Sequence, residues 1–435
     1  MAESEMKTLA IVGGGAAGLA AAVAAGERAR AESASLEIAI YERDDRVGRS
    51  ILATGNGRCN FSNAKLDVSA YRNSAFVQDA LRGLTASFDA TEDERYGKIR
   101  RENGDDVHAF FCRHGLMWRV EDDGREYPLP NKASVVVDVL RAAAADAGAR
   151  EVCGCAVAAV EQPRSEGGRF TLRMVDGRLE RADAVILASG HAAQSLEAAG
   201  LKVLPSQPVL GPLRVGDADI PFARELDNIR VRCMVSLLRA GEDGARQVVA
   251  SERGELMFRK YGVSGICVFN LSRFADAGDV LSIDLLDAGE PSDAEQFLFS
   301  RRKLLSSTFD CALTYADMLR GLVLPRVAEA LLKRAGIAPS AAFGKPDVPK
   351  LAALLTQLEL TVAGIGDESI CQVHRGGLDV GGFDPHTMAA CEVTGLFAVG
   401  EALDVDGPCG GYNLHWAWAS GLLAGRSAAE QLMAT

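Results

Sequence analysis

The stretch Leu9-Ala-Ile-Val-Gly13-Gly-Gly15-Ala-Ala-Gly18-Leu-Ala decides the fold. An apolar run that can form a buried strand enters Gly13-x-Gly15-x-x-Gly18, and an alanine-rich helical pattern continues to about Ala25. In this fingerprint the glycines allow a tight turn, a close approach of backbone to pyrophosphate, and close packing of helix on strand. The helix N-terminus then faces the phosphates with its positive dipole end. The stretch predicts a Rossmann-type nucleotide site; the alternative is a glycine-rich turn that binds nothing.

A second apolar run, Leu36–Tyr41, ends in an acidic residue where such folds hold an adenosine. Glu42 follows that run at about the twenty-residue spacing from which a carboxylate bonds the ribose hydroxyls. Arg43, one step on, is expected to lie against the adenine.

Composition sets limits on the class of protein. The 435 residues are too many for one compact core, so two or three domains are expected. A net charge of −12 offers no broad basic footprint and argues against a nucleic-acid partner. The first apolar stretch is rich in Gly and Ala and follows the acidic segment Met1–Glu5, so it predicts neither a signal peptide nor a membrane span. We therefore expect a cytoplasmic protein with no membrane partner; the oligomeric state is left open.

The ten cysteines are scattered and form no CxxC pair. This spacing indicates neither a zinc site nor a redox-active dithiol, so no metal is expected. Most of the cysteines are expected to be small buried residues.

Residues 43–63 form a long stretch rich in Gly, Asn, Ser and Thr, including Gly48-Arg49 and Thr54-Gly-Asn-Gly-Arg-Cys-Asn60. Such a composition predicts a loop with many free backbone donors. A loop of this length beside a nucleotide site is more often functional than merely solvated. A later apolar run ends in Ala188-Ser189-Gly190, small residues that let a backbone pass close to a ligand.

The middle of the chain changes character at about Pro205. Prolines punctuate short apolar runs, and residues 231–239, 247–251 and 280–285 predict strands of a separate β domain. Residues 290–342 are helical in pattern, which predicts a small helical domain nested inside the β domain. The expected division is an FAD-type domain from 1–204 and 364–435, an inserted β domain at 205–289, a helical sub-insert at 290–349, and a return strand at 350–363.

The chain ends with a second strand, glycine-rich loop and helix. Gly400-Glu-Ala-Leu-Asp-Val-Asp-Gly407 leads to Gly410-Gly-Tyr-Asn-Leu414. A second helix N-terminus therefore returns to a ligand-binding place.

These blocks together resemble the YhiN/BaiN-like flavoproteins, bacterial FAD-dependent oxidoreductases, over nearly the whole chain. The TGNGRCN and LDVDG…GGYNL blocks are specific to that family. The resemblance implies an α/β fold with a glutathione-reductase-like FAD domain, a β-barrel-like insert and a helical sub-insert. Two departures stand out: Ser50 replaces the usual lysine, and a longer glycine-rich segment is replaced by His191-Ala-Ala-Gln194-Ser-Leu.

The flavin interpretation assigns a part of the cofactor to each block. Pyrophosphate falls to Gly13, Gly15, Ala16, Ala17 and Gly18, and the adenosine to Glu42, Arg43 and, by resemblance, the backbone of Val157. The ribityl chain and flavin edge fall to Gly48, Arg49 and the loop with Thr54, Gly55, Asn56, Cys59 and Asn60, and Glu401 is expected to hold a ribityl hydroxyl. Ala188, Ser189, Gly190 and Gly400 are further cofactor-binding candidates. The flavin pyrimidine ring falls to the helix start at Gly411, Tyr412, Asn413 and Leu414, whose N–H groups would stabilise negative charge on reduced flavin.

Arg58, Tyr412 and His415 are the candidates for proton donation or substrate polarisation, although flavin chemistry can proceed with water as the acid. His415 can equally be structural, and Cys59 lacks the paired cysteine that disulfide reductases need. No second dinucleotide fingerprint occurs between residues 168 and 382, so NAD(P)H is expected only as a transient reductant.

The leading hypothesis is an FAD oxidoreductase acting on a small, largely apolar molecule, through reduction of an activated C=C bond in a bile-acid or steroid-like substrate. An amine oxidase of the aminoacetone type, passing electrons to oxygen, is the alternative. A flavoprotein that acts on RNA is a further alternative, against which the acidic charge argues. A flavoprotein with only a structural or sensing role completes the set.

Overall fold

The structure is a computed structural model of the chain. It describes residues 6–89, 105–165, 167–191, 197–198, 200–241, 244–287, 291–308 and 312–434. Most of the charged stretch 89–101, Cys311 and most of the segment that follows His191 lie outside the described residues. The chain forms two compact units, Met1–Gln207 with Val373–Thr435, and Pro208–Gln372.

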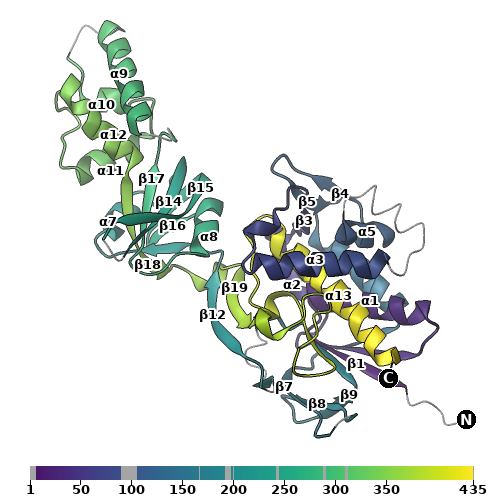
Figure 1. Cartoon of the computed structure of the whole chain (residues 1–435). Helices are drawn as coiled ribbons and strands as arrows, with labels where there is room; N and C mark the ends of the chain where they lie inside the picture. The colour runs from purple at the N-terminus through teal and green to yellow at the C-terminus, as the bar shows by residue number, and fades with distance from the viewer. Residues whose placement is uncertain are drawn as a thin grey trace, which may run out of the picture. The chain divides into compact units, whose positions relative to one another are not determined.

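The first unit is built on a five-stranded parallel sheet (Figure 1). Its order is β20 (Leu396–Ala398), β10 (Ala184–Leu187), β1 (Lys7–Val12), β2 (Leu36–Tyr41) and β6 (Ala149–Val152). The strands β1, β2, β10 and β20 are short apolar runs that are largely buried, which is the pattern that parallel sheets require. The edge strand β6 carries Arg150 and Glu151 and is only partly buried. The α/β prediction with a parallel sheet is therefore confirmed, and the carboxyl ends of β1, β2, β10 and β20 meet at one edge.

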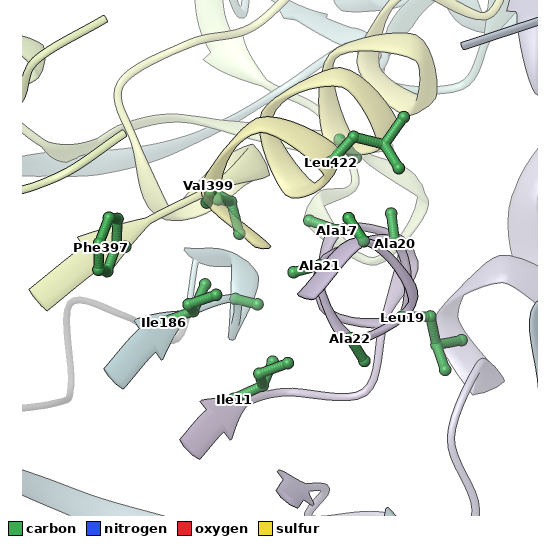
Figure 2. Close-up of a cluster of buried hydrophobic side chains, with 14 of the residues drawn as sticks. Ile11, Ala17, Leu19, Ala20, Ala21, Ala22, Ile186, Phe397, Val399 and Leu422 are labelled. Carbon is green, nitrogen blue, oxygen red and sulfur yellow. The ribbon is translucent and has the colours of Figure 1, made fainter. Parts of the chain in front are cut away.

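Two helices from opposite ends of the chain pack together on this sheet. Helix α1 (Ala16–Ala31) lies between the strands and α13 (Tyr412–Ala434), and Figure 2 shows its alanines wedged between Ile11, Ile186 and Leu422. A Cβ at Gly421 or Gly425 of α13 would run into backbone oxygens of α1. Small residues on both helices thus let the two backbones approach closely.

Smaller elements complete the first unit. Helices α3 (Ser74–Asp89), α5 (Asp106–Arg113) and α6 (Ala133–Asp146) accompany three further sheets. These sheets are β3–β5–β4 (Ser62–Asn63, Arg125–Pro128, Trp118–Val120), β11–β7–β8–β9 (Glu197–Ala198, Val157–Glu161, Phe170–Met174, Leu179–Ala182) and β12–β19 (Val203–Val209, Val373–Leu378).

The second unit contains a closed six-stranded barrel. Its order is β13 (Leu213–Val215), β16 (Gly262–Ser264), β15 (Arg246–Arg259), β14 (Arg230–Ala240), β17 (Val280–Asp284) and β18 (Leu358–Ile365). Two short helices, α7 (Ile220–Glu225) and α8 (Ile266–Ser272), belong to it. Four more lie in the chain between β17 and β18: α9 (Pro291–Thr308), α10 (Tyr315–Leu319), α11 (Pro325–Arg334) and α12 (Val348–Thr356).

The predicted return strand at 350–363 is wrong in its first half. Residues up to Thr356 continue α12, which has a proline in its first turn and buries Leu351 and Leu355. The strand itself, β18, closes the barrel. The residues after it also belong to the second unit, because Gly366 N and Gln372 N donate to the carbonyls of Pro212 and Leu210.

Candidate functional site

The fingerprint glycines occupy the carboxyl edge of the parallel sheet. Gly13 has a φ of +107°, and its N–H donates to Tyr41 O over 2.9 Å. A Cβ at Gly13 would lie 2.5 Å from Ala188 O, so β10 ends directly against the turn. A Cβ at Gly18 would collide with Gly13 O. Gly13 and Gly18 are therefore required by the packing of the protein, whether or not a ligand is bound.

Gly15 differs, because little protein occupies the space beside it. It is the N-cap of α1, and a Cβ there would meet only Ser50 Oγ, at 3.2 Å. Nearby, the buried Ser189 Oγ has no hydrogen-bond partner among the described residues. An open position at the N-terminus of a sixteen-residue helix fits a bound pyrophosphate.

Glu42 is oriented by the fingerprint. Its Oε2 accepts the N–H of Gly14 at 2.8 Å, and its Oε1 accepts the N–H of Asp44 at 2.9 Å. Gly48 N donates to Gly14 O at 2.7 Å, which brings the start of the long loop to the same place. The sequence-predicted acid, fingerprint and loop therefore converge.

The structure shows no direct contact between Glu42 and the side chains of Arg43, Arg49 or Val157 among the hydrogen bonds and ion pairs of the described residues. Arg43 is exposed, and Arg49 is exposed and within 3.5 Å of Asp45. Val157 begins β7, whereas Cys155, two residues earlier, donates its N–H to Glu42 O at 2.8 Å. Backbone near Val157 is thus adjacent to Glu42 through Cys155.

The loop after Gly48 has an unusual backbone. It forms helix α2 (Arg49–Ala53) and a 3₁₀ turn, η1 (Thr54–Gly57), and then left-handed residues gather in it. The φ values are 56° at Gly55, 55° at Asn56, 80° at Gly57 and 58° at Cys59. Glycine and asparagine tolerate this conformation best, which explains the G-N-G letters.

Cys59 is a core residue within this loop. Its side chain is 0% exposed, and burial raises the pKa of its thiol to about 12. A neutral thiol without exposed surface is neither a nucleophile nor a redox group. Its predicted place beside the cofactor is therefore limited to its backbone, whereas Asn60 uses its side-chain oxygen to accept Glu126 N at 3.2 Å.

The end of this loop meets the start of α13. Asn63 Nδ2 donates to Gly410 O at 2.7 Å, and a Cβ at Gly411 would collide with Ser62 O. Gly410 and Gly411 have φ values of 121° and 99°. The loop and the second glycine block are thus brought together, as the flavin interpretation requires.

Tyr412 and Asn413 use their polar atoms within the protein. The Tyr412 hydroxyl accepts Asp67 N at 3.1 Å, and the Asn413 amide bonds both Gly407 N and Gly407 O, at 2.8 and 2.9 Å. These side chains hold the loops around α13. Leu414 is half-buried beside them.

The geometry favours the structural alternative for His415. Its ring is 3% exposed, its Nδ1 lies 2.9 Å from Ser62 Oγ, and burial lowers its pKa. Because so little of His415 is exposed, a structural role fits it better than contact with a substrate.

Arg58 is the remaining candidate with an accessible charge. Its side chain is 34% exposed, and its guanidinium lies 4.3 Å over the ring of Tyr127. Nη2 donates to Tyr127 Oη at 3.2 Å, and Nη1 lies 3.4 Å from Glu121 Oε1. The stack holds the guanidinium in place and leaves part of it open.

The sequence did not indicate a network of polar side chains around His108, which lies close to His415 and its partner Ser62. His108 Nδ1 lies 2.8 Å from Asp105 Oδ1, and its Nε2 lies 2.6 Å from Glu126 Oε2. Burial lowers the pKa of His108, but hydrogen bonds to the two carboxylates outweigh it and raise the pKa to about 10. His415 Nε2 lies 3.8 Å from Asp105 Oδ2. Only the spacing of Asp105 and His108, an N-cap pattern, was visible in the sequence.

A second cluster of polar side chains that the sequence did not indicate surrounds Glu401. Its Oε1 accepts the backbone N–H of His374 at 2.8 Å and lies 3.3 Å from His374 Nδ1. The rings of His374 and His191 are stacked, with centroids 4.0 Å apart. Gly400, before it, is held by Ser420 Oγ and by Trp416 Nε1, and Gly190 approaches Glu401.

Together these features define an α/β protein with a Rossmann dinucleotide site at the carboxyl edge of its sheet. The chain belongs to the family described as "HI0933-like protein Rossmann domain", whose match spans residues 7–427. It is an FAD-dependent oxidoreductase. No helix among the described residues is long and apolar enough to cross a membrane.

Named relatives match nearly end to end. The chain is 31% identical to a 3-dehydro-bile acid delta(4,6)-reductase of Clostridium scindens, covering 98% of this chain and 100% of the relative. It is 27% identical to a ribosomal RNA dihydrouridine synthase of Escherichia coli, covering 94% and 95%. A ribosomal RNA dihydrouridine synthase of Haemophilus influenzae is 25% identical, covering 97% and 98%.

Proposed function

We propose that the protein reduces an activated C=C bond in a small, largely apolar, bile-acid or steroid-like molecule, with NAD(P)H as a transient reductant. The observation that carries this proposal is the end-to-end similarity to the bile-acid reductase, in which both units of this chain have counterparts. The single fingerprint supports a transient rather than a resident nicotinamide.

In this proposal the first unit holds FAD non-covalently. The N-terminus of α1 at Gly15 faces the pyrophosphate, Glu42 bonds the adenosine ribose, and Glu401 bonds a ribityl hydroxyl. When bound, FAD supplies the hydride-transfer chemistry.

Arg58 is the residue that we propose to polarise the substrate. Reduction of a C=C bond conjugated to a carbonyl places negative charge on the carbonyl oxygen. A guanidinium held over Tyr127 and partly exposed can stabilise that charge without reorganising. Loss of one such donor typically costs about 10²–10³ in rate.

The test is an anaerobic reduction of a 3-oxo-Δ4,6 bile acid by the FAD-loaded protein with NADH or NADPH. We expect one C=C bond of the dienone to be reduced for each nicotinamide oxidised, and a roughly 10²-fold lower kcat in Arg58→Ala with FAD content unchanged. Hydrogen peroxide released from aminoacetone in air, with no reduction of the enone by NADH or NADPH, would favour the amine oxidase instead.

A second candidate is reduction of a uridine in RNA, favoured by the similarity to two ribosomal RNA dihydrouridine synthases. Dihydrouridine is uridine with its C5=C6 bond saturated, a bond conjugated to a carbonyl, so the chemistry is of the same kind. The net charge of −12 favours the small molecule over RNA. A gain of two hydrogens on a uridine of ribosomal RNA, without turnover of any enone, would reverse this choice.

A further inference from the structure

Three side chains from distant parts of the sequence meet at one edge of the first unit. His191 follows Gly190 after β10, His374 lies in β19, and Glu401 follows β20. One ligand atom from each lies within 4.8 Å of the others. His374 and Glu401 are half-buried, whereas His191 is exposed.

The donor set suits a divalent transition metal. Two imidazoles and one carboxylate are ligands that zinc uses in sites that keep a fourth position open. A tetrahedral site with bonds of about 2.0–2.1 Å needs ligand atoms roughly 3.3 Å apart. His374 Nδ1 and Glu401 Oε1 already lie 3.3 Å apart.

The remaining ligand can adjust. The His191 ring stacks on His374 with ring centroids 4.0 Å apart, and because His191 is exposed we expect its ring to be able to turn toward Glu401. Glu401 is also held by the backbone N–H of His374, at 2.8 Å, the kind of outer contact that orients a metal-binding carboxylate.

We infer that His191, His374 and Glu401 form a binding site for a divalent transition-metal ion, represented by Zn²⁺, with the fourth position open to water. The expectation of no metal rested on cysteine spacing. The three ligands lie at or near the ends of three different strands, far apart in the sequence, so no local sequence motif predicts the site.

The site has a consequence for cofactor binding. Glu401 is the carboxylate that we propose for the ribityl chain, so Zn²⁺ and FAD are expected to compete for it. This competition rests on the proposed function, whereas the metal site rests on its own geometry.

The test is calorimetric titration of the full-length chain, without FAD, with Zn²⁺. Cys391→Ser serves as the background, because Cys391 is exposed and thiolates bind zinc. We expect one Zn²⁺ per chain and an affinity at least about tenfold lower in His191→Ala and in His374→Ala. His386→Ala is the matched control, since His386 is exposed and lies outside the cluster. Circular dichroism checks that each variant is folded.

Unchanged affinity in both folded histidine variants, or no Zn²⁺ binding, would overturn the metal site. Repeating the titration with saturating FAD separates the two claims. A lower apparent affinity supports the competition. An unchanged, histidine-dependent affinity keeps the metal site and removes Glu401 from the flavin. Loss of FAD binding in Glu401→Ala, with no Zn²⁺ binding in the unaltered chain, keeps the flavin placement and removes the metal site.

Discussion

At the scale of single residues, burial decides which reactive groups can act. Cys59 and His415 lie in or beside the blocks assigned to the cofactor, and the sequence alone cannot show that both are buried. Arg58 stands in the same block as Cys59 but keeps a third of its side chain open. The sequence therefore predicts which loop lies beside the fingerprint, whereas the choice among its residues depends on packing between distant segments.

The buried chain around His108 predicts a pH dependence of stability. Its folded pKa, raised to about 10, lies above the ordinary value of 6.5. A raised pKa contributes stability that is fully present below pH 6.5 and is lost as the pH rises through about 10. Urea unfolding at pH 6.5 and pH 9.5 should show the unaltered protein losing stability at the higher pH. His108→Gln should be less stable at pH 6.5 and lose less between the two.

His386→Gln is the control for this measurement, because His386 is exposed and is not a partner of the Asp105 and Glu126 carboxylates that bond His108. If His108→Gln kept the full pH dependence of the unaltered protein, the claim that His108 is charged between two carboxylates would be contradicted.

At the scale of elements, local patterns predict most strands and helices of the first unit. The apolar runs of β1, β2, β10 and β20 are short, and each except β2 has a glycine within three residues of its carboxyl end, which makes them recognisable in the sequence. Helix α12 is harder to recognise, because only Thr356 and Gln357 separate its apolar positions from those of β18. The proline in its first turn was the local signal for a helix start.

The contact between α1 and α13 predicts that a Gly→Ala substitution in α13, which usually stabilises a helix, lowers the stability of the protein. Gly→Ala inside a helix ordinarily gains about 1 kcal/mol. At Gly421 the added Cβ would run into Ala17 O, so Gly421→Ala should instead destabilise the protein by about 1–3 kcal/mol. Urea denaturation measures the difference. Ser427→Ala, at a half-buried position of the same helix, is the control and should have little effect.

An equal or higher stability of Gly421→Ala would contradict the close packing of the two helices.

At the scale of the whole molecule, the chain leaves the first unit and returns to it at neighbouring places. Strands β12 and β19 pair with each other, and Arg375 donates to the side chain of Gln207. The change at Pro205 was visible in the prolines, close to the observed start of the second unit at Pro208. The return at Val373 was not, because barrel strands and loops of the second unit resemble those of the first in composition.

This arrangement predicts that the second unit can be removed. We expect a chain in which a short Gly-Ser linker replaces residues 208–372 to fold and to bind FAD with an affinity close to that of the full chain. Fluorescence titration with FAD gives the comparison. A folded deletion protein, by circular dichroism, that fails to bind FAD would show that the cofactor site needs the second unit.

The central claim is that the Gly13–Gly18 turn holds FAD, and the flavin released from the purified protein tests it most directly. Heat denaturation and chromatography should give one FAD per chain from the unaltered protein, and none from Gly15→Val even after reconstitution, because the valine fills the space over α1. Gly382→Val is the matched control, since a Cβ there meets nothing within 4 Å, and it should keep its FAD. Release of FMN, no flavin after reconstitution, or full FAD content in Gly15→Val would contradict the account.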